Sequence, residues 1–168
     1  MTKVYVANTE NTGKGLFASR NIKKNEAIFS VQGRIIKDSK YHSGSYYKMG
    51  PRWLAIGENT WISPLRTNPW WYINHSCNPN AGLRGMKTVV AMKNIKKGSE
   101  VTLDYSITED DPSWKMKCSC SHDNCRKVIR SVRFLPDGIF KKYRPFIPIF
   151  LQKSYLNATN RQSFKPER

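Results

Sequence analysis

Four cysteines and their spacing constrain the fold of this chain more than any other feature. Three of them lie within eight residues, in the order Cys118-Ser-Cys120-Ser-His-Asp-Asn-Cys125, and the fourth, Cys77, lies far before them. A structural zinc ion takes four soft ligands in a tetrahedron, so three clustered thiolates and one distant thiolate would complete a site. His122 is an alternative fourth ligand that would leave Cys77 free. The spacing therefore predicts a zinc site that holds residues 118–125 in place.

Length and composition indicate one small domain in an intracellular setting. The chain has 168 residues, of which 39% are hydrophobic, enough for one modest core. No apolar run approaches the ~18 residues of a membrane span, and the first residues lack the apolar centre of a secretory signal. We expect an intracellular protein, nuclear or cytoplasmic, with no membrane partner. In such a compartment clustered cysteines hold metal more often than they form disulfides.

Positive charge dominates the chain and is concentrated in its last third. The net charge is +17, and residues 114–168 carry 13 Lys or Arg against 3 Asp or Glu, a net +10 of that total. Such an excess excludes a neutral surface and indicates an anionic partner or anionic surroundings. The charge alone does not say which partner it is.

The hydrophobic pattern predicts a strand-rich fold. Alternation and β-branched residues indicate strands at Gly15–Ala18, Ala27–Val31, Thr88–Met92 and Val101–Tyr105. Each pair flanks a similar lysine-rich turn, Asn21-Ile-Lys-Lys in one and Asn94-Ile-Lys-Lys in the other. The similarity of the two turns suggests two related β units. Helical signal is scarce before residue 135, and Pro136–Tyr143 can open a helix because proline is favoured in a first turn.

Three further segments carry polar residues in patterns that suggest chemistry. They are Gly13-Lys-Gly-Leu-Phe17, Tyr72-Ile-Asn-His-Ser-Cys-Asn-Pro-Asn80 and Glu100-Val-Thr-Leu-Asp-Tyr105. A glycine-rich turn before a strand allows a ligand to approach the backbone. His75 and Cys77 could form a nucleophile–base pair. In an extended chain, however, they would lie ~6.5 Å apart along the strand, beyond the hydrogen-bond reach that such a pair needs.

Together and in this order, the motifs resemble those of the SET-domain protein lysine methyltransferases that carry a post-SET zinc segment. Residues 13–18 resemble the family's G-x-G motif, residues 73–80 its N-H-S-C-x-P-N motif, and residues 100–105 its E-L-T-x-D-Y strand. The C-x-C-x4-C run of residues 118–125 is similar to the post-SET appendage. The resemblance covers roughly residues 3–127.

The resemblance implies a mostly β fold with short helices: a SET-domain β-clip fold with a knot-like crossing around residues 74–77 and 101–105. It implies a SET catalytic domain at 3–111, a post-SET zinc segment at 112–127 and a basic C-terminal extension at 128–168 with short helices. We expect the last ~10 residues to be frayed, as polar chain ends commonly are.

The same resemblance implies a protein-lysine N-methyltransferase that transfers methyl from S-adenosylmethionine. Tyr105 is then the catalytic residue. The implied residues are Lys14, Gly15, Leu16, Asn74 and His75 for the cofactor, and Cys77, Cys118, Cys120 and Cys125 for one structural zinc ion. The implied substrate channel contains Val31, Tyr72, Leu83 and Leu103, where family members often carry other aromatic residues. Fewer hydroxyl groups around the amine predict di- or trimethyllysine as the product.

The substrate and the partners are the least constrained part of the prediction. We expect a protein with an accessible lysine, histone-like or ribosomal and associated with DNA or RNA. The C-terminal extension either packs as a cap through its apolar residues or contacts nucleic acid through Lys141, Lys142 and Arg144. The alternative function is a SET-like module that has lost turnover and binds nucleic acid or chromatin. Methyl transfer to a protein panel separates the two functions.

Overall fold

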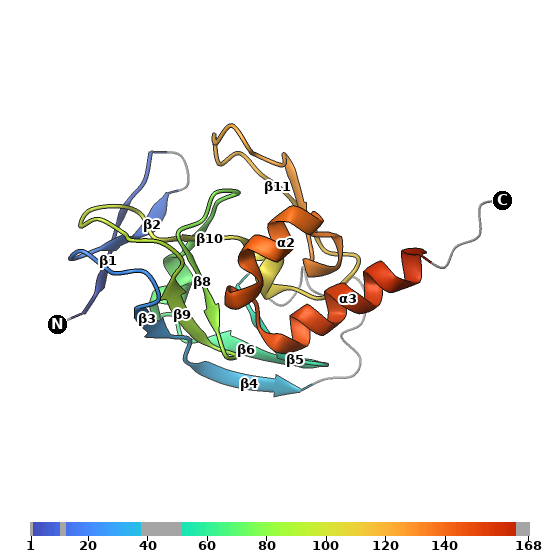
Figure 1. The fold of residues 1–168 in the computed structure, drawn as a ribbon. Coiled ribbons are helices and arrows are strands. Elements are labelled where there is room, and N and C mark those ends of the chain that lie inside the picture. Colours follow the sequence, from blue (N-terminus) through green and yellow to red (C-terminus); the bar gives the residue numbers. More distant parts are fainter. Residues whose placement is uncertain (1, 11–12, 38–51, 164–168) are drawn as a thin grey trace.

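Strands make up the larger part of the fold, and two helices pack against them. The computed structural model describes residues 2–10, 13–37 and 52–163. Residues 38–51 lie outside the described residues. Figure 1 shows helices α2 and α3 together on one side of the molecule, with β11 beside α2 and most of the other strands on the other side. The expectation of a mostly β fold with short helices is confirmed.

The described strands form four small sheets. In the order of their hydrogen-bonded neighbours they are β1 (Val4–Asn8) with β2 (Lys14–Ala18); β3 (Ala27–Ser30), β9 (Thr88–Ala91), β8 (Ala81–Arg84), β10 (Thr102–Leu103) and β7 (Asn74–His75); β4 (Gly33–Lys37), β6 (Thr60–Pro64) and β5 (Leu54–Gly57); and β11 (Lys115–Lys117) with β12 (Val128–Arg130). All pairs are antiparallel except those that β10 makes with β7 and β8.

The two lysine-rich turns of the sequence lie against each other in a reciprocal arrangement. Ile22 and Ile95 exchange backbone N–H···O bonds of 2.9 Å in both directions. The Asn94 side chain accepts from the Lys24 N–H at 2.8 Å, and the Asn21 side chain accepts from the Lys97 N–H at 2.9 Å. The sequence echo therefore corresponds to a local two-fold contact that joins the chain's two β units.

Strand β10 lies between β7 and β8 and runs parallel to both. The Ser76 N–H donates to the Leu103 carbonyl at 3.0 Å, and the Asn80 N–H donates to the Thr102 carbonyl at 3.3 Å. Asn80 also accepts from the Thr102 N–H through its side chain, at 2.9 Å. Residues 74–81 therefore pair with both edges of the strand that leads to Tyr105, in the region where the resemblance implies a knot-like crossing.

The C-terminal extension packs onto the main core. It contains α2 (Asp137–Tyr143) and α3 (Ile149–Ser163) and the 3-10 turns η3 (Val132–Phe134) and η4 (Arg144–Phe146). Its buried core residues are Val132, Leu135, Phe140, Tyr143, Ile147, Leu151 and Tyr155. The Phe140 and Tyr155 rings stack with centroids 3.7 Å apart. The predicted packing as an apolar cap is therefore confirmed for these residues, whereas Ile149 is 71% exposed.

Both ends of the described extension have regular secondary structure. Helix α3 continues through Ser163, so the first residues of the expected frayed tail are helical. Strand β12 begins at Val128 and pairs with β11, so one sheet joins the cysteine-rich segment to the extension. No helix in the described part of the chain is both long enough and apolar enough to cross a membrane.

Candidate active site

The four cysteine sulfurs converge. The Sγ atoms of Cys77, Cys118, Cys120 and Cys125 all lie within 4.8 Å of one another, and those of Cys77 and Cys118 are 3.8 Å apart. A tetrahedral zinc ion with Zn–S bonds of about 2.3 Å would place its sulfurs about 3.8 Å apart. The donor set therefore fits zinc in chemistry and in spacing. His122, the alternative ligand, is exposed and lies outside the group.

Backbone N–H groups point at these sulfurs. The Cys77 N–H donates to the Cys120 Sγ at 3.5 Å, and the Arg126 N–H donates to the Cys77 Sγ at 3.4 Å. Burial opposes ionisation of Cys120. Backbone N–H groups, that of Cys77 first, outweigh burial and lower the pKa of Cys120 to about 7. The turn is closed by Lys127, which has a φ of +60° and whose carbonyl accepts from the Cys118 N–H at 2.6 Å. The local structure thus favours a thiolate, the form that binds metal, at Cys120, whereas burial raises the pKa of Cys118.

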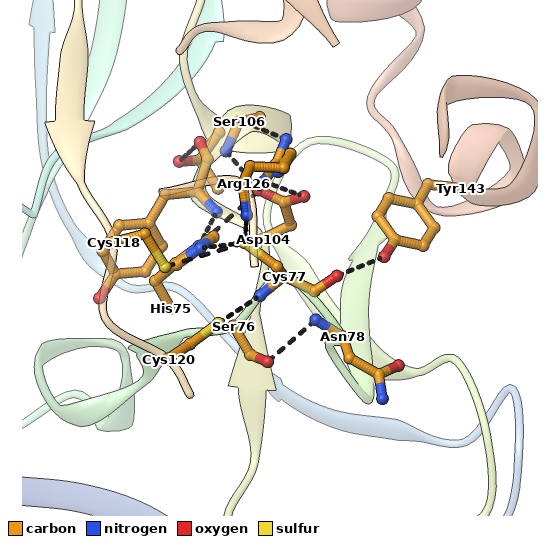
Figure 2. Close-up of polar contacts among 12 residues, drawn as sticks. His75, Ser76, Cys77, Asn78, Asp104, Ser106, Cys118, Cys120, Arg126 and Tyr143 are labelled. Atoms are coloured by element: carbon orange, nitrogen blue, oxygen red, sulfur yellow. Dashed lines mark hydrogen bonds and ion pairs between the residues drawn. The ribbon is translucent and has the colours of Figure 1, made fainter. Parts of the chain in front are cut away.

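His75 links the cysteine cluster to Tyr105. Figure 2 shows His75 beside Cys77. Its Nδ1 accepts from the Tyr105 backbone N–H at 3.2 Å, so the proton lies on Nε2, which is 3.4 Å from the Cys77 Sγ. Burial lowers the pKa of His75 to about 4, with the Arg126 guanidinium adding to the effect and the Asp104 carboxylate opposing it. The ring is therefore neutral at pH 7, and its 3.7 Å approach to Asp104 is not an ion pair.

This geometry corrects the argument about His75 and Cys77. The two side chains lie within hydrogen-bond distance because strand β7 ends at His75 and the chain then bends. A nucleophile–base pair is nevertheless excluded, because the Nε2 that faces Cys77 carries the proton and cannot accept another. Cys77 also belongs to the cluster of four thiols.

A buried ion pair that sequence reasoning missed holds the cysteine-rich segment to β10. Asp104 is fully buried and accepts from the Arg126 Nη2 at 2.6 and 2.7 Å. Arg126 also donates to the Ser106 hydroxyl at 3.2 Å, and Asp104 accepts from the Ser106 N–H at 3.0 Å. Figure 2 shows this group beside His75. Because Arg126 follows Cys125 directly, the pair positions the cysteine-rich segment next to Tyr105.

Tyr105 lies in a pocket with an aromatic wall. The lining residues are Arg52, Trp53, Trp70, Ile73, Tyr105, Thr108 and Trp114. The Tyr105 hydroxyl donates to the Ile73 carbonyl at 2.7 Å. Burial raises the pKa of Tyr105, the Arg52 guanidinium opposes the rise, and the Glu100 carboxylate adds to it. The phenol is therefore protonated at neutral pH. Its oxygen lies beside the Ile73 carbonyl, in the lining of the pocket.

The residues expected to line a substrate channel lie elsewhere. Val31, Leu83 and Leu103 are at most 1% exposed and belong to the main core. Tyr72 is half-buried and packs against that core. None of the four lines the pocket beside Tyr105. The tryptophans that do so were missed. The sequence signal that could have indicated them is the presence of five Trp in so small a domain.

The glycine-rich strand contacts Asn74, the residue that follows Ile73 of the pocket lining. The Asn74 Nδ2 donates to the Lys14 carbonyl at 3.2 Å and to the Glu100 Oε1 at 2.8 Å. A Cβ on Gly15 would lie 2.5 Å from that carboxylate oxygen and 3.2 Å from the Asn74 Nδ2. Ile73 faces the pocket, and its neighbour Asn74 contacts Lys14, as alternating side chains in extended backbone do.

The residues predicted to bind the cofactor therefore lie next to one another. The one change of role concerns His75, whose ring is not available to a ligand. Leu16 is 1% exposed as a whole residue and belongs to the main core. The His75 side chain is 4% exposed and both of its ring nitrogens are engaged. A ligand contact from His75 would come from its backbone. The exposed Lys14 and half-buried Asn74 complete the group.

Comparison with known proteins agrees with the site. The model of the SET domain family matches residues 13–106. The histone-lysine N-methyltransferase trr of Drosophila melanogaster is 31% identical over 74% of this chain and 6% of its own length. Histone-lysine N-methyltransferase 2B of Homo sapiens is 30% identical over 70% of this chain and 5% of its own. A relative from Candida albicans, named as H3 lysine-36 specific, is 28% identical over 76% of this chain and 17% of its own length.

The matched region contains both Tyr105 and the glycine-rich strand. This chain spans only a small part of these relatives' length, and the family model covers 94 of its 168 residues, from the glycine-rich strand to the residue after Tyr105. This region contains three segments of the site: the glycine-rich strand, the Asn74–Cys77 segment and strand β10, which ends before Tyr105. The chain belongs to the SET domain family.

Proposed function

We propose that this chain is a protein-lysine N-methyltransferase that uses S-adenosylmethionine. One observation carries the proposal: Ile73 lines the pocket and accepts from the Tyr105 hydroxyl, and the next residue, Asn74, contacts the glycine-rich strand. A substrate side chain and a cofactor could then approach one point from opposite sides. Placing two reactants in line is a large source of rate acceleration.

S-adenosylmethionine, when bound, supplies a methyl group on a positively charged sulfur. The backbone of Lys14, Gly15, Leu16 and His75 and the side chain of Asn74 would hold it, and the close packing around Gly15 supports this. Tyr105 would orient the amine rather than accept its proton, because its phenol remains protonated. The amine loses its proton to solvent, and its lone pair forms the new N–C bond as the S–C bond breaks.

The four cysteines would hold one zinc ion with a structural role. Trp114, which lines the pocket, packs against the cluster of Cys77, Cys118 and Ile129 together with Met116. The metal would therefore fix one wall of the pocket. No open coordination position is needed for methyl transfer, in agreement with a closed four-thiolate site.

We propose di- or trimethyllysine as the product. This assignment now depends on the residues that line the pocket rather than on Val31, Leu83 and Leu103. Among the described residues Tyr105 alone contributes a phenol hydroxyl to the pocket lining. The indole N–H of Trp70 is already bonded to the Arg52 carbonyl at 2.7 Å. Fewer hydrogen bonds to the amine leave it free to rotate and to accept further methyl groups.

The substrate we propose is an intracellular, histone-like or ribosomal protein associated with nucleic acid. The names of the relatives, which are histone-lysine methyltransferases, support a basic protein as substrate. Lys141, Lys142 and Arg144 are exposed on α2 and η4 and could contact phosphates. Such contacts would offset the repulsion between a basic substrate and a chain of net charge +17.

The test is methyl transfer from labelled S-adenosylmethionine to histones, ribosomal proteins and DNA-packaging proteins, with Tyr105→Phe as the control. Labelled lysine that depends on Tyr105 supports the proposal. Cofactor binding without any methylated product would support the alternative, a SET-like module that binds chromatin or nucleic acid. Mass spectra that stop at one methyl group after exhaustive reaction would exclude the di- and trimethyl assignment.

A further inference from the structure

The pocket beside Tyr105 contains a permanent positive charge. Arg52 lines the pocket together with Tyr105 and Trp114. A guanidinium does not lose its proton in proteins. No described carboxylate lies within ion-pair distance of Arg52, whereas Arg126 and Arg133 are both paired with aspartates. The charge of Arg52 therefore acts on whatever enters the pocket.

Several contacts fix the position of Arg52. Its Nη1 donates to the Trp71 carbonyl, and its own carbonyl accepts from the Trp70 indole at 2.7 Å. Its Cζ lies 5.8 Å from the centroid of the Trp71 ring. Its field reaches Tyr105, whose pKa it lowers against the effect of burial. The guanidinium is thus held between the tryptophans and the phenol.

Other charged or titratable groups lie near the pocket without lining it. Glu100 acts on Tyr105 with the opposite sign and is bonded to Asn74. His75 contacts the Tyr105 ring edge-on at 5.4 Å and is neutral. Asp104 is paired with Arg126, and the buried Glu109, which follows Thr108, accepts from the N–H groups of Asp110 and Asp111. Arg66 lies over Trp71 at 5.2 Å but is exposed and does not line the pocket.

We propose that Arg52 holds the substrate lysine in its neutral, nucleophilic form; this role rests on the proposed function. A lysine amine has a pKa of about 10.4 in water, and a like charge together with poor solvation disfavours the ammonium form. Arg52 would drive the proton to solvent before the N–C bond forms. This accounts for a site in which Tyr105 is protonated and no described side chain of the pocket is a base.

The pH dependence of kcat tests this role, because kcat reports on groups of the bound complex. At saturating peptide and cofactor, kcat should rise with pH as the lysine amine loses its proton. Arg52→Gln should move this rising limb of the pH–kcat profile to higher pH by about 1 unit. Because one pKa unit is a tenfold change, kcat at pH 7 should fall about tenfold. At high pH the variant should recover the wild-type rate. A purely structural defect would lower kcat at every pH and leave the limb in place.

Two matched variants control the experiment. Arg52→Lys retains the charge and should retain the wild-type limb, and Arg66→Gln removes a charge over the same Trp71 face from outside the pocket and should not move it. An unchanged limb in Arg52→Gln, or an equal shift in Arg66→Gln, overturns the proposal. If Arg52→Gln does not fold, the wild type still tests the proposal: a rising limb at the free-amine pKa of about 10.4 overturns it.

The failure of this role differs from the failure of the proposed function. If the wild-type chain methylates no protein of the panel, the methyltransferase assignment fails and the role of Arg52 fails with it. If the wild type methylates its substrate while the limb is insensitive to Arg52, only the role of Arg52 is overturned.

Discussion

At the scale of single residues, His75 connects the parts of the site. It accepts from the Tyr105 N–H, approaches the Cys77 sulfur and is neutral because it is buried. The sequence motif suggested a cofactor contact for this residue. Its side chain is instead a positioning group between the pocket and the cysteine cluster.

Replacing His75 by Gln should weaken both functions that it connects. Loss of a hydrogen-bond partner to a metal ligand typically costs about 10–100-fold in metal affinity or activity. Chelator competition for zinc and initial rates of methyl transfer measure the two effects. His122→Gln is the matched control, since His122 is exposed and outside the cysteine cluster, and it should behave like the wild type. Equal behaviour of the two variants would contradict the assigned role.

Gly15 provides a second test at this scale. A methyl group there would displace the Glu100 carboxylate, 2.5 Å away, and with it the bond from Glu100 to Asn74. Gly15→Ala should therefore weaken S-adenosylmethionine binding by about tenfold or more, which is about 1.4 kcal/mol. Calorimetric titration measures the Kd. Gly138→Ala, in a helix with no atom within 4 Å of the new Cβ, should leave the Kd unchanged; an unaffected Kd in Gly15→Ala would count against the cofactor site.

At the scale of elements, the cysteine-rich segment and the β11–β12 sheet form a unit that is fastened to β10. The fastening consists of the Cys77 sulfur and the Asp104–Arg126 pair. Arg126→Gln leaves a buried carboxylate without its partner, which costs about 3–5 kcal/mol. Urea unfolding measures the loss.

The control for that variant is Arg133→Gln. Arg133 pairs with Asp110 where both side chains are about one-third exposed (31% and 29%), so the expected loss is about 0–1 kcal/mol. Similar losses in the two variants would show that the Asp104–Arg126 pair does not fasten the segment.

Removing zinc should loosen the same unit. Purified protein should contain one zinc per chain by elemental analysis, and a strong chelator should lower the Tm by about 10 °C, since a domain of this size shifts by about 2–4 °C per kcal/mol. Methyl transfer should fall in parallel, because Trp114 packs on the cluster and lines the pocket. Metal-free protein with unchanged Tm and rate would contradict a structural zinc ion.

At the scale of the whole molecule, the sequence predicted the strands, the cysteine cluster and the similarity of the two lysine-rich turns. Each of these depends on local pattern or residue chemistry. It did not predict the pocket. Val31, Leu83 and Leu103 occupy the core instead, and the wall comes from Trp53, Trp70 and Trp114, which lie far apart in the chain. Which apolar side chains face a pocket and which face a core depends on tertiary packing, and no spacing rule contains that information.

Apart from Arg52, most of the molecule's positive charge is separate from its chemistry. The extension contributes apolar residues to the core and keeps Lys141, Lys142 and Arg144 exposed. The residues proposed for cofactor, zinc and catalysis supply almost none of the net +17. The excess charge is therefore better suited to docking than to methyl transfer.

The central claim is that this chain methylates lysine side chains of a protein. The most direct measurement is mass spectrometry of candidate basic proteins after incubation with S-adenosylmethionine and either the wild type or Tyr105→Phe. The account predicts lysine residues that gain two or three methyl groups with the wild type and a greatly reduced gain with the variant. Cofactor binding by a folded, zinc-loaded chain that leaves every lysine unmodified would contradict it.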